Sequence, residues 1–128
     1  MMAVPQQEGQ ETQLISPLHK ATVSNYCLTF GYVLYGSGAG QLSVSILYSS
    51  GVSRQVLEMF GDQGLEWKTT KVSLSGVSED FQLVFTSRQG STEMAPAVDD
   101  IYVSEGKCSF PGWYPLFHTH CFMYQNLL

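Results

Sequence analysis

The residues with the most chemistry to offer are three cysteines. Cys27 and Cys108 lie at the two ends of a region of short alternating apolar runs, and this placement suggests one long loop closed by a disulfide. Two unpaired buried thiols are the alternative. Because the count is odd, at least one cysteine is free or pairs outside the chain, and Cys121 is left over. Disulfides persist in oxidising compartments, so a cross-link would favour an extracellular module over a cytosolic enzyme.

Two adjacent carboxylates, Asp99 and Asp100, interrupt an otherwise apolar segment. Alternation along a strand would send one of them inward, where an unpaired charge is costly. Hydrogen bonds to a neighbouring loop, or an ion pair with Arg88, would satisfy it. The sharper alternative is a hard cation such as Ca²⁺, which prefers several oxygen ligands. Further oxygen donors for such an ion are Asp62, Glu66 and Glu93. General acid–base work by the pair is a third interpretation, without a nucleophile nearby in the sequence.

The sequence His118-x-His120-Cys121 holds soft-metal ligand types, but a closed tetrahedral site needs a second pair of ligands that the segment lacks. Accidental clustering is the favoured interpretation. Trp67 is predicted to be an anchor in the core rather than a platform for a ligand. No nucleophile elbow and no zinc-protease helix motif occurs in the sequence. We therefore predict no catalytic residue and no cofactor, with a structural cation at Asp99 and Asp100 as the open alternative.

Composition bounds the class of protein. With 128 residues, 44% hydrophobic and 13% charged, the chain fits one folded domain rather than a disordered polymer. The net charge of −5 argues against nucleic acid, because phosphate binding needs clustered basic residues. The six basic residues are scattered: Lys20, Arg54, Lys68, Lys71, Arg88 and Lys107. No apolar run approaches the roughly eighteen residues of a membrane-spanning helix.

Short segments with period-two alternation cover the middle of the chain and predict strands. They are 13–17, 25–35, 42–48, 53–60, 67–74, 81–85 and 97–103. The segment 25–35 is apolar on both faces, which is typical of a strand buried between layers or paired centrally. The Gly-rich segment 36–40 is predicted to be a hairpin connection. A phosphate cradle is disfavoured there because a strand, not a helix, follows.

This spacing of six or seven short strands predicts an all-β, jelly-roll-like antiparallel β-sandwich. We expect the sandwich to occupy residues 13–108. Residues 1–12 are predicted to be a polar, unstructured leader, and they lack the apolar stretch of a signal peptide. Residues 109–128 concentrate aromatic residues and prolines without periodicity, and we expect this tail to lie outside the domain.

Several landmarks, in their order and spacing, resemble the MAM domain, a module named after meprin, a neuropilin-type antigen and the mu-type receptor tyrosine phosphatase. The matching elements are Leu14 with Ser16-Pro17, Cys27-Leu28-Thr29-Phe30-Gly31-Tyr32, Gly36, Gly40-Gln41-Leu42-Ser43-Val44, Gly61-Asp62-Gln63-Gly64, Trp67, Phe81-Gln82-Leu83-Val84-Phe85, Asp99-Asp100-Ile101 and Gly106-Lys107-Cys108. The resemblance covers residues 13–108.

The resemblance implies an extracellular or cell-surface jelly roll that mediates adhesion and protein–protein contact, with homophilic partners among the possibilities. It also implies a disulfide between Cys27 and Cys108. About a third of the module, with the strands that complete the sheets, is expected to be absent at the N-terminal side. An incomplete sheet would leave an unpaired edge and favour self-association. The rival function is a carbohydrate-binding jelly roll that uses exposed aromatic residues.

Overall fold

The computed structural model describes residues 9–36, 38, 40–90 and 96–108. Within these ranges the secondary structure is entirely strand, as expected, and no helix is present that is long and apolar enough to span a membrane. The strands are β1 (Glu11–Ile15), β2 (Tyr26–Val33), β3 (Gln41–Tyr48), β4 (Ser53–Phe60), β5 (Lys68–Leu74), β6 (Phe81–Arg88) and β7 (Ala97–Glu105).

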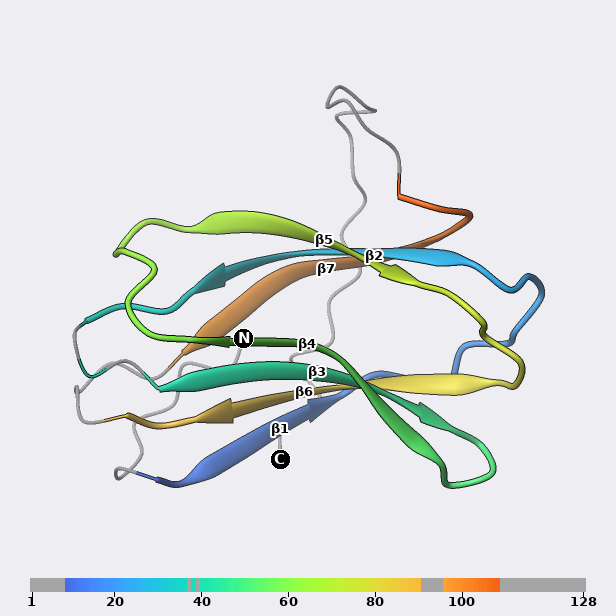
Figure 1. Cartoon of the computed structure of the whole chain (residues 1–128), viewed down its shortest axis with the longest axis horizontal. Coiled ribbons are helices and arrows are strands. Elements are labelled where there is room, and N and C mark those ends of the chain that lie inside the picture. Colours follow the sequence, from blue (N-terminus) through green and yellow to red (C-terminus); the bar gives the residue numbers. More distant parts are fainter. Residues whose placement is uncertain (1–8, 37, 39, 91–95, 109–128) are drawn as a thin grey trace.

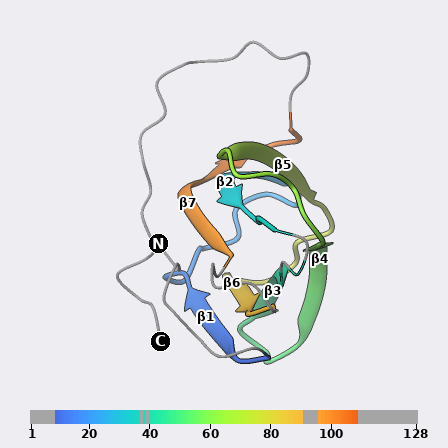
Figure 2. The ribbon, with the colours of Figure 1, turned by 90° about the vertical axis from the view of Figure 1, so that its left-hand side faces the viewer.

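The strands form two antiparallel sheets that face each other as a sandwich (Figure 1). One sheet has four strands in the order β1-β6-β3-β4, and the other has three in the order β5-β2-β7. Viewed from the end, the edges β1 and β7 lie on one side of the sandwich and β4 and β5 on the other (Figure 2). This is the jelly-roll-like, all-β architecture that the sequence predicts.

Alternation places the core between the sheets. On β3, Leu42, Val44 and Ile46 are fully buried, while the serines between them face outward. On β6, Phe81, Leu83 and Phe85 follow the same rule. Because successive strand side chains point to opposite faces, each period-two apolar run supplies one wall of the core.

The segment that is apolar on both faces became β2, the central strand of the three-stranded sheet. Its inward side chains include Leu28 and Phe30, which are fully buried, and the Phe30 ring meets the Phe85 ring edge-on across the sandwich at 5.2 Å between centroids. Seven of its eight residues are buried, because β5 and β7 flank it on both sides. The prediction of a centrally paired strand is confirmed.

The hairpin predicted at residues 36–40 is wrong. β2 pairs with β5 and β7, whereas β3 pairs with β4 and β6, so this connection crosses from one sheet to the other. A Gly-rich break between two alternating runs fits either geometry, and alternation does not specify the pairing partner. Gly40 serves close packing instead: an ideal Cβ on it would lie 1.7 Å from the carbonyl oxygen of Arg88. Only glycine fits such an approach.

The N-terminal boundary of the sandwich also moves. β1 begins at Glu11, so the last two residues of the expected leader pair with β6, Glu11 opposite Arg88 and Thr12 opposite Ser87. The strand ends before Pro17, as the sequence indicates. Residues 1–8 and the aromatic tail 109–128 lie outside the described residues.

Candidate interaction surface

Cys27 and Cys108 form a disulfide with their Cα atoms 4.7 Å apart. The cross-link joins the start of β2 to the segment after β7, across a sequence separation of 81 residues. The strands already meet there, because Cys27 lies opposite Ser104 in the register. The bond therefore has a structural role in the sandwich. Cys121 lies outside the described residues.

A β-bulge on β7 decides the position of the two carboxylates. Opposite Phe30 the register shifts, so that β7 carries one residue more than β2 between the pairs Thr29–Tyr102 and Gly31–Asp99. Asp100 takes the extra position with a φ of 52°, a left-handed conformation that aspartate tolerates better than most residues. Its backbone N–H donates to Asp99 Oδ1 at 2.9 Å.

The bulge overturns the expectation that one carboxylate points inward. Val98 and Ile101, three residues apart, are both buried, while Asp99 is partly exposed and Asp100 is exposed. The sequence pattern missed this because an added residue breaks the period of two, and no residue type in the segment announces it.

The metal-ligand hypotheses gain no support. Across the part of the chain that the structure describes, no group of three or more His, Cys, Asp or Glu side chains is placed to hold a metal ion. Asp62 and Glu66 belong to the β4–β5 connection, whereas Asp99 and Asp100 lie on β7. Glu93 and the His118-x-His120-Cys121 cluster lie outside the described residues.

Trp67 is not a core residue, so that prediction is wrong. The side chain remains 51% exposed. Its ring lies on the outer face of the three-stranded sheet, against Gly31: an ideal Cβ on Gly31 would lie 3.6 Å from Trp67 Cε3. The tryptophan precedes β5 and so lies outside the alternation of that strand, which is why the pattern could not assign it to a face.

The loop that carries Trp67 is fastened to the β2–β3 connection at one end of the sandwich, the left end in Figure 1. The N–H of Gln63 donates to the Leu34 carbonyl at 2.7 Å. The carboxylate of Asp62 accepts from the N–H of Gly36 at 3.0 Å and from the N–H of Gly64 at 2.9 Å. Two connections that belong to different pairs of strands are thus held together by one backbone hydrogen bond and by the Asp62 carboxylate.

The charge of Asp62 is favoured by this arrangement. Hydrogen bonds from the Gly64 and Gly36 amides, together with the positive charge of Lys68, hold the pKa of its carboxyl below the ordinary value of 3.8. The carboxylate is therefore ionised at neutral pH and can accept both hydrogen bonds.

Around this fastened loop pair lie large apolar side chains that face solvent. We call this region the Trp67 end, and it consists of Tyr35 (42% exposed), Phe60 (66%), Leu65 (59%) and Trp67 (51%). Three of these four are aromatic. Tyrosine, tryptophan and phenylalanine are enriched at protein interfaces, because they offer large, rigid contact area.

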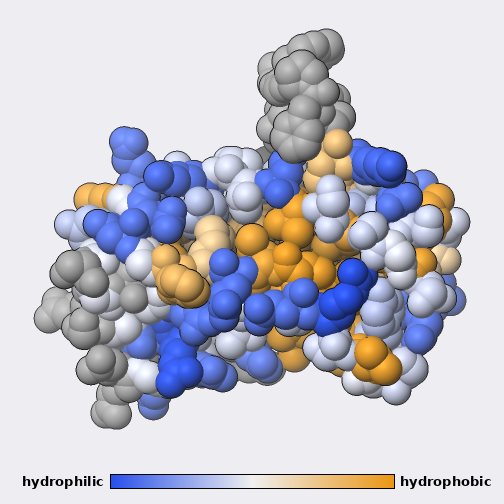
Figure 3. Space-filling view, in the orientation of Figure 1, coloured by the Kyte–Doolittle hydropathy of each residue, from blue (hydrophilic) through white to orange (hydrophobic). Residues whose placement is uncertain are grey.

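The Trp67 end continues into an apolar opening between the edges of β4 and β5, which we call the seam. Three β4 side chains that pack on the core are partly exposed there: Val56, Leu57 and Met59. Figure 3 shows hydrophobic atoms between hydrophilic borders along this line. At the other end of the seam, Arg54 bridges the sheets, since its Nη2 donates to Tyr48 Oη at 3.1 Å and to the Ser75 carbonyl at 2.7 Å.

Sequence reasoning did not find this surface. It predicted a strand over residues 53–60, and the structure adds a register shift that leaves Val56 bulged opposite β3. The signal that was present is the run Val56-Leu57-x-Met59-Phe60, which has more apolar residues than one buried face of an edge strand can cover.

Comparison with known proteins gives a consistent result. The family model described as "MAM domain, meprin/A5/mu" matches residues 1–109. The "MAM domain-containing glycosylphosphatidylinositol anchor protein 1" of Gallus gallus is 31% identical over 107 residues, which is 81% of this chain and 11% of that protein. "Neuropilin-1" of Xenopus laevis is 31% identical over 111 residues, covering 81% of this chain and 12% of its own length. The chain thus spans about a ninth of the length of these relatives.

Among solved structures, one described as "CBM4 structure and function" superposes with a TM-score of 0.53 and 12% sequence identity, covering 80% of each chain. At this level of identity the likeness concerns the fold. It agrees with the jelly-roll-like sandwich described above.

Proposed function

This chain belongs to the MAM domain family, and we propose that it is a non-catalytic extracellular module that docks on another protein through the Trp67 end and the seam. Its location is inferred from the relatives, whose names include a glycosylphosphatidylinositol anchor protein. The Cys27–Cys108 disulfide agrees with an oxidising compartment.

One observation carries the docking proposal: the exposed aromatic side chains at the Trp67 end stand on loops that are already held in place. A partner that binds Phe60 and Trp67 does not have to order the loop first, because Asp62 and Gln63 fasten it to the β2–β3 connection. Pre-organisation of this kind reduces the entropic cost of association. A few such anchors can supply most of the binding free energy.

A non-catalytic role is supported by the same described residues. His19 is the one histidine among them, and its ring stacks on Phe81 with 5.2 Å between centroids. Its side chain serves packing, not proton transfer at an open surface. In the described part of the chain, the acidic pair on β7 belongs to no group of three or more His, Cys, Asp or Glu side chains that could hold a metal ion.

The test compares two triple variants of the full chain, made through a secretory route and displayed on beads that are offered to cells. In one, Phe60, Leu65 and Trp67 become alanine. In the other, Leu18, Val23 and Val52 become alanine; these are similarly exposed, at 54%, 40% and 59%, but lie at the opposite end of the sandwich. We expect the first triple to lower bead-to-cell binding at least tenfold and the second to leave it unchanged.

Equal binding by the two variants would contradict the proposed surface. Treating the cells with protease before the assay should abolish binding if the partner is a protein. If instead glycosidase treatment abolishes binding and protease does not, the carbohydrate-binding alternative replaces the proposal. That alternative stays a prediction, since the likeness to a CBM4 structure extends to the fold alone.

A further inference from the structure

Four strands form the outer edges of the two sheets within the described residues: β1 and β4 in one sheet, β5 and β7 in the other. An edge strand presents backbone N–H and C=O groups that can pair with a strand from another chain. Native proteins discourage such pairing with short strands, bulges or charges. The four edges differ in how well they are protected.

Three of the four edge strands have backbone features that discourage pairing with another strand. β1 has five residues. β4 has the register shift that bulges Val56, and β7 has the bulge at Asp100. A bulge interrupts the row of pairing groups and twists the edge, so an added strand would lose part of its hydrogen bonds there.

β5 has neither the bulges of β4 and β7 nor the short length of β1, although it carries two lysines. Its seven residues pair with β2 without a register shift, from Tyr26 opposite Leu74 to Tyr32 opposite Lys68. The β-branched residues Thr69, Thr70 and Val72 favour an extended backbone. This strand therefore offers a longer regular edge than β1, and an edge without the bulges of β4 and β7.

The position of β5 adds a second argument, because its edge borders the seam. A strand added to β5 would extend the three-stranded sheet toward β4, and its inward side chains would cover Val56, Leu57 and Met59. One end of the added strand would lie near Trp67, which directly precedes β5. Apolar residues at alternate positions of the incoming strand suit this inner side.

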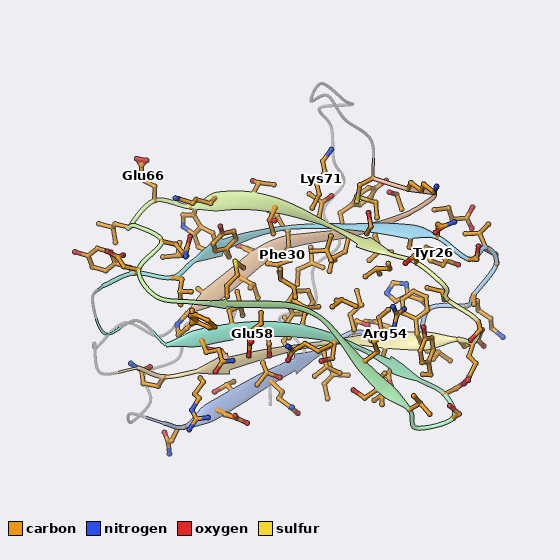
Figure 4. All side chains as sticks on the ribbon, in the orientation of Figure 1. Tyr26, Phe30, Arg54, Glu58, Glu66 and Lys71 are labelled. Atoms are coloured by element: carbon orange, nitrogen blue, oxygen red, sulfur yellow. A yellow bond between two sulfur atoms is a disulfide. The ribbon has the colours of Figure 1, made fainter. Side chains whose placement is uncertain are left out.

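The charge of β5 determines which residues suit the outward positions of the added strand. The charged residues of β5 are Lys68 and Lys71, with no acidic residue in the strand, although the whole chain has a net charge of −5. Lys71 is partly buried, lies opposite Thr29 in the register and is seen on the outer side of the sheet (Figure 4). Acidic residues at the outward positions of an added strand would complement it.

Lys71 also acts against a second copy. An antiparallel pairing of two β5 strands about their centre places Lys71 opposite Lys71 on the outer side of the sheet. Like charges that face each other directly across strands are destabilising.

We propose that β5 is a docking edge for an extended segment of a different protein, in which apolar residues alternate with acidic ones. The segment adds as a fourth strand beside β5 and closes the seam. This inference rests on the proposed function, because it specifies how the partner of the Trp67 end and the seam is held.

The test uses two blocked seven-residue peptides, one alternating valine with glutamate and the other alternating valine with lysine. Backbone amide exchange of residues 68–74 is followed by NMR on the full, disulfide-bonded chain. We expect the glutamate peptide to slow exchange at free-edge amides of β5, and the lysine peptide to have little effect. The matched control is the glutamate peptide N-methylated at two adjacent residues, which blocks both of its edges and should abolish the protection.

The variant Lys71→Glu tests the role of charge. It should weaken the glutamate peptide about fivefold and strengthen the lysine peptide by a similar factor. Unchanged exchange in β5 with either peptide, equal protection by both, or protection on β7 instead would overturn the proposal. Slower exchange of β5 that depends on protein concentration, without peptide, would identify a second copy as the occupant and also overturn it.

The proposed function can fail separately. If Lys71→Glu leaves bead-to-cell binding intact while the Phe60, Leu65 and Trp67 triple removes it, adhesion through the Trp67 end holds and the docking edge does not. If neither the unmodified chain nor any variant binds cells but the glutamate peptide protects β5, the edge holds and the adhesion proposal fails.

Discussion

The two ends of the sandwich use similar residue types for opposite purposes. At the Trp67 end, Phe60 and Trp67 are more than half exposed. At the other end, which we call the Tyr26 end, the aromatic rings of Tyr26, Tyr48 and Phe81 are buried. The exposed apolar residues of the Tyr26 end are aliphatic, namely Leu18, Val23 and Val52.

The Tyr26 end is closed by contacts between the 16–25 connection and the strands. The Tyr26 hydroxyl accepts the N–H of Thr22 at 2.8 Å and donates to the Lys20 carbonyl at 3.3 Å. His19 exchanges two backbone hydrogen bonds with Phe81, at 2.7 and 3.0 Å, and its ring stacks on the phenylalanine. The Tyr26 ring meets Phe81 from the edge at 5.3 Å between centroids.

The two ends distinguish aromatic residues that pack the core from aromatic residues that are available for binding. At the Tyr26 end, buried rings pack on one another, and the Tyr26 hydroxyl hydrogen-bonds the backbone of the 16–25 connection. At the Trp67 end, hydrogen bonds fix the backbone of the loops, and the aromatic rings remain exposed to solvent. Four predictions test this division, and two of them compare a change at the Tyr26 end with a matched change at the Trp67 end.

The largest effect should come from the disulfide, which joins the two chain segments beside Tyr26. Replacing Cys27 and Cys108 by serine should lower the free energy of unfolding by about 4.5 kcal/mol, from the chain entropy of the long loop that the bond closes in the unfolded state. Denaturant titration of the variant against the oxidised chain measures the loss. A change below about 1 kcal/mol would mean that the bond constrains the unfolded chain little.

The next effect separates two phenylalanines. Phe81→Ala should cost about 3–5 kcal/mol, because it removes a fully buried ring between His19 and Tyr26. Phe60→Ala, at the exposed end, should change stability by no more than about 0.5 kcal/mol. Both values come from the same denaturation experiment. Similar losses at the two positions would abolish the distinction between the ends.

A smaller effect is expected from one hydroxyl group. Tyr26→Phe leaves the N–H of Thr22 without its acceptor and should cost about 1 kcal/mol. The matched control is Tyr35→Phe at the Trp67 end, whose side chain is 42% exposed and where we expect no measurable change. If Tyr35→Phe proves the more destabilising, the Trp67 end is packed more tightly than its exposure indicates.

The smallest effect depends on pH. Burial lowers the pKa of His19 below its ordinary value of 6.5, so the unfolded chain takes up this proton at a higher pH than the folded one. The contribution to stability is therefore complete above pH 6.5 and declines as the pH falls through the lowered value. His19→Phe keeps a ring against Phe81 and should flatten this decline relative to the unchanged chain. Parallel pH profiles for the two proteins would show that His19 does not titrate on unfolding.

Much of the fold could be read from local pattern. The alternation of Leu42, Val44 and Ile46 predicts one strand face, and the two-sided apolar character of residues 25–35 predicts a central strand. Both predictions are confirmed, because the buried face of a strand is visible in the residue pattern of that strand alone. The pairing of strands could not be read this way, so the 36–40 connection was assigned to a hairpin although it crosses between the sheets.

The candidate surface was harder to predict than the fold. Asp99 and Asp100 attracted attention as a charged pair in an apolar segment, and a bulge places both away from the core. Trp67 was assigned to the core by residue type, and its position before β5 leaves it on an outer face. Both sites lie outside a regular period-two run. At Asp100, β7 carries an extra residue, and Trp67 precedes the first residue of β5.

The strands, the sandwich class and the family can be inferred from the amino-acid sequence alone, because alternating burial and the order of short motifs are local properties of the chain. Which strands share a sheet, which edges remain regular and which aromatic side chains stay exposed follow from the folded arrangement. These features depend on contacts between segments far apart in the chain, such as Asp62 with Gly36 and Arg54 with Ser75. A local pattern carries no information about the partner across such a contact.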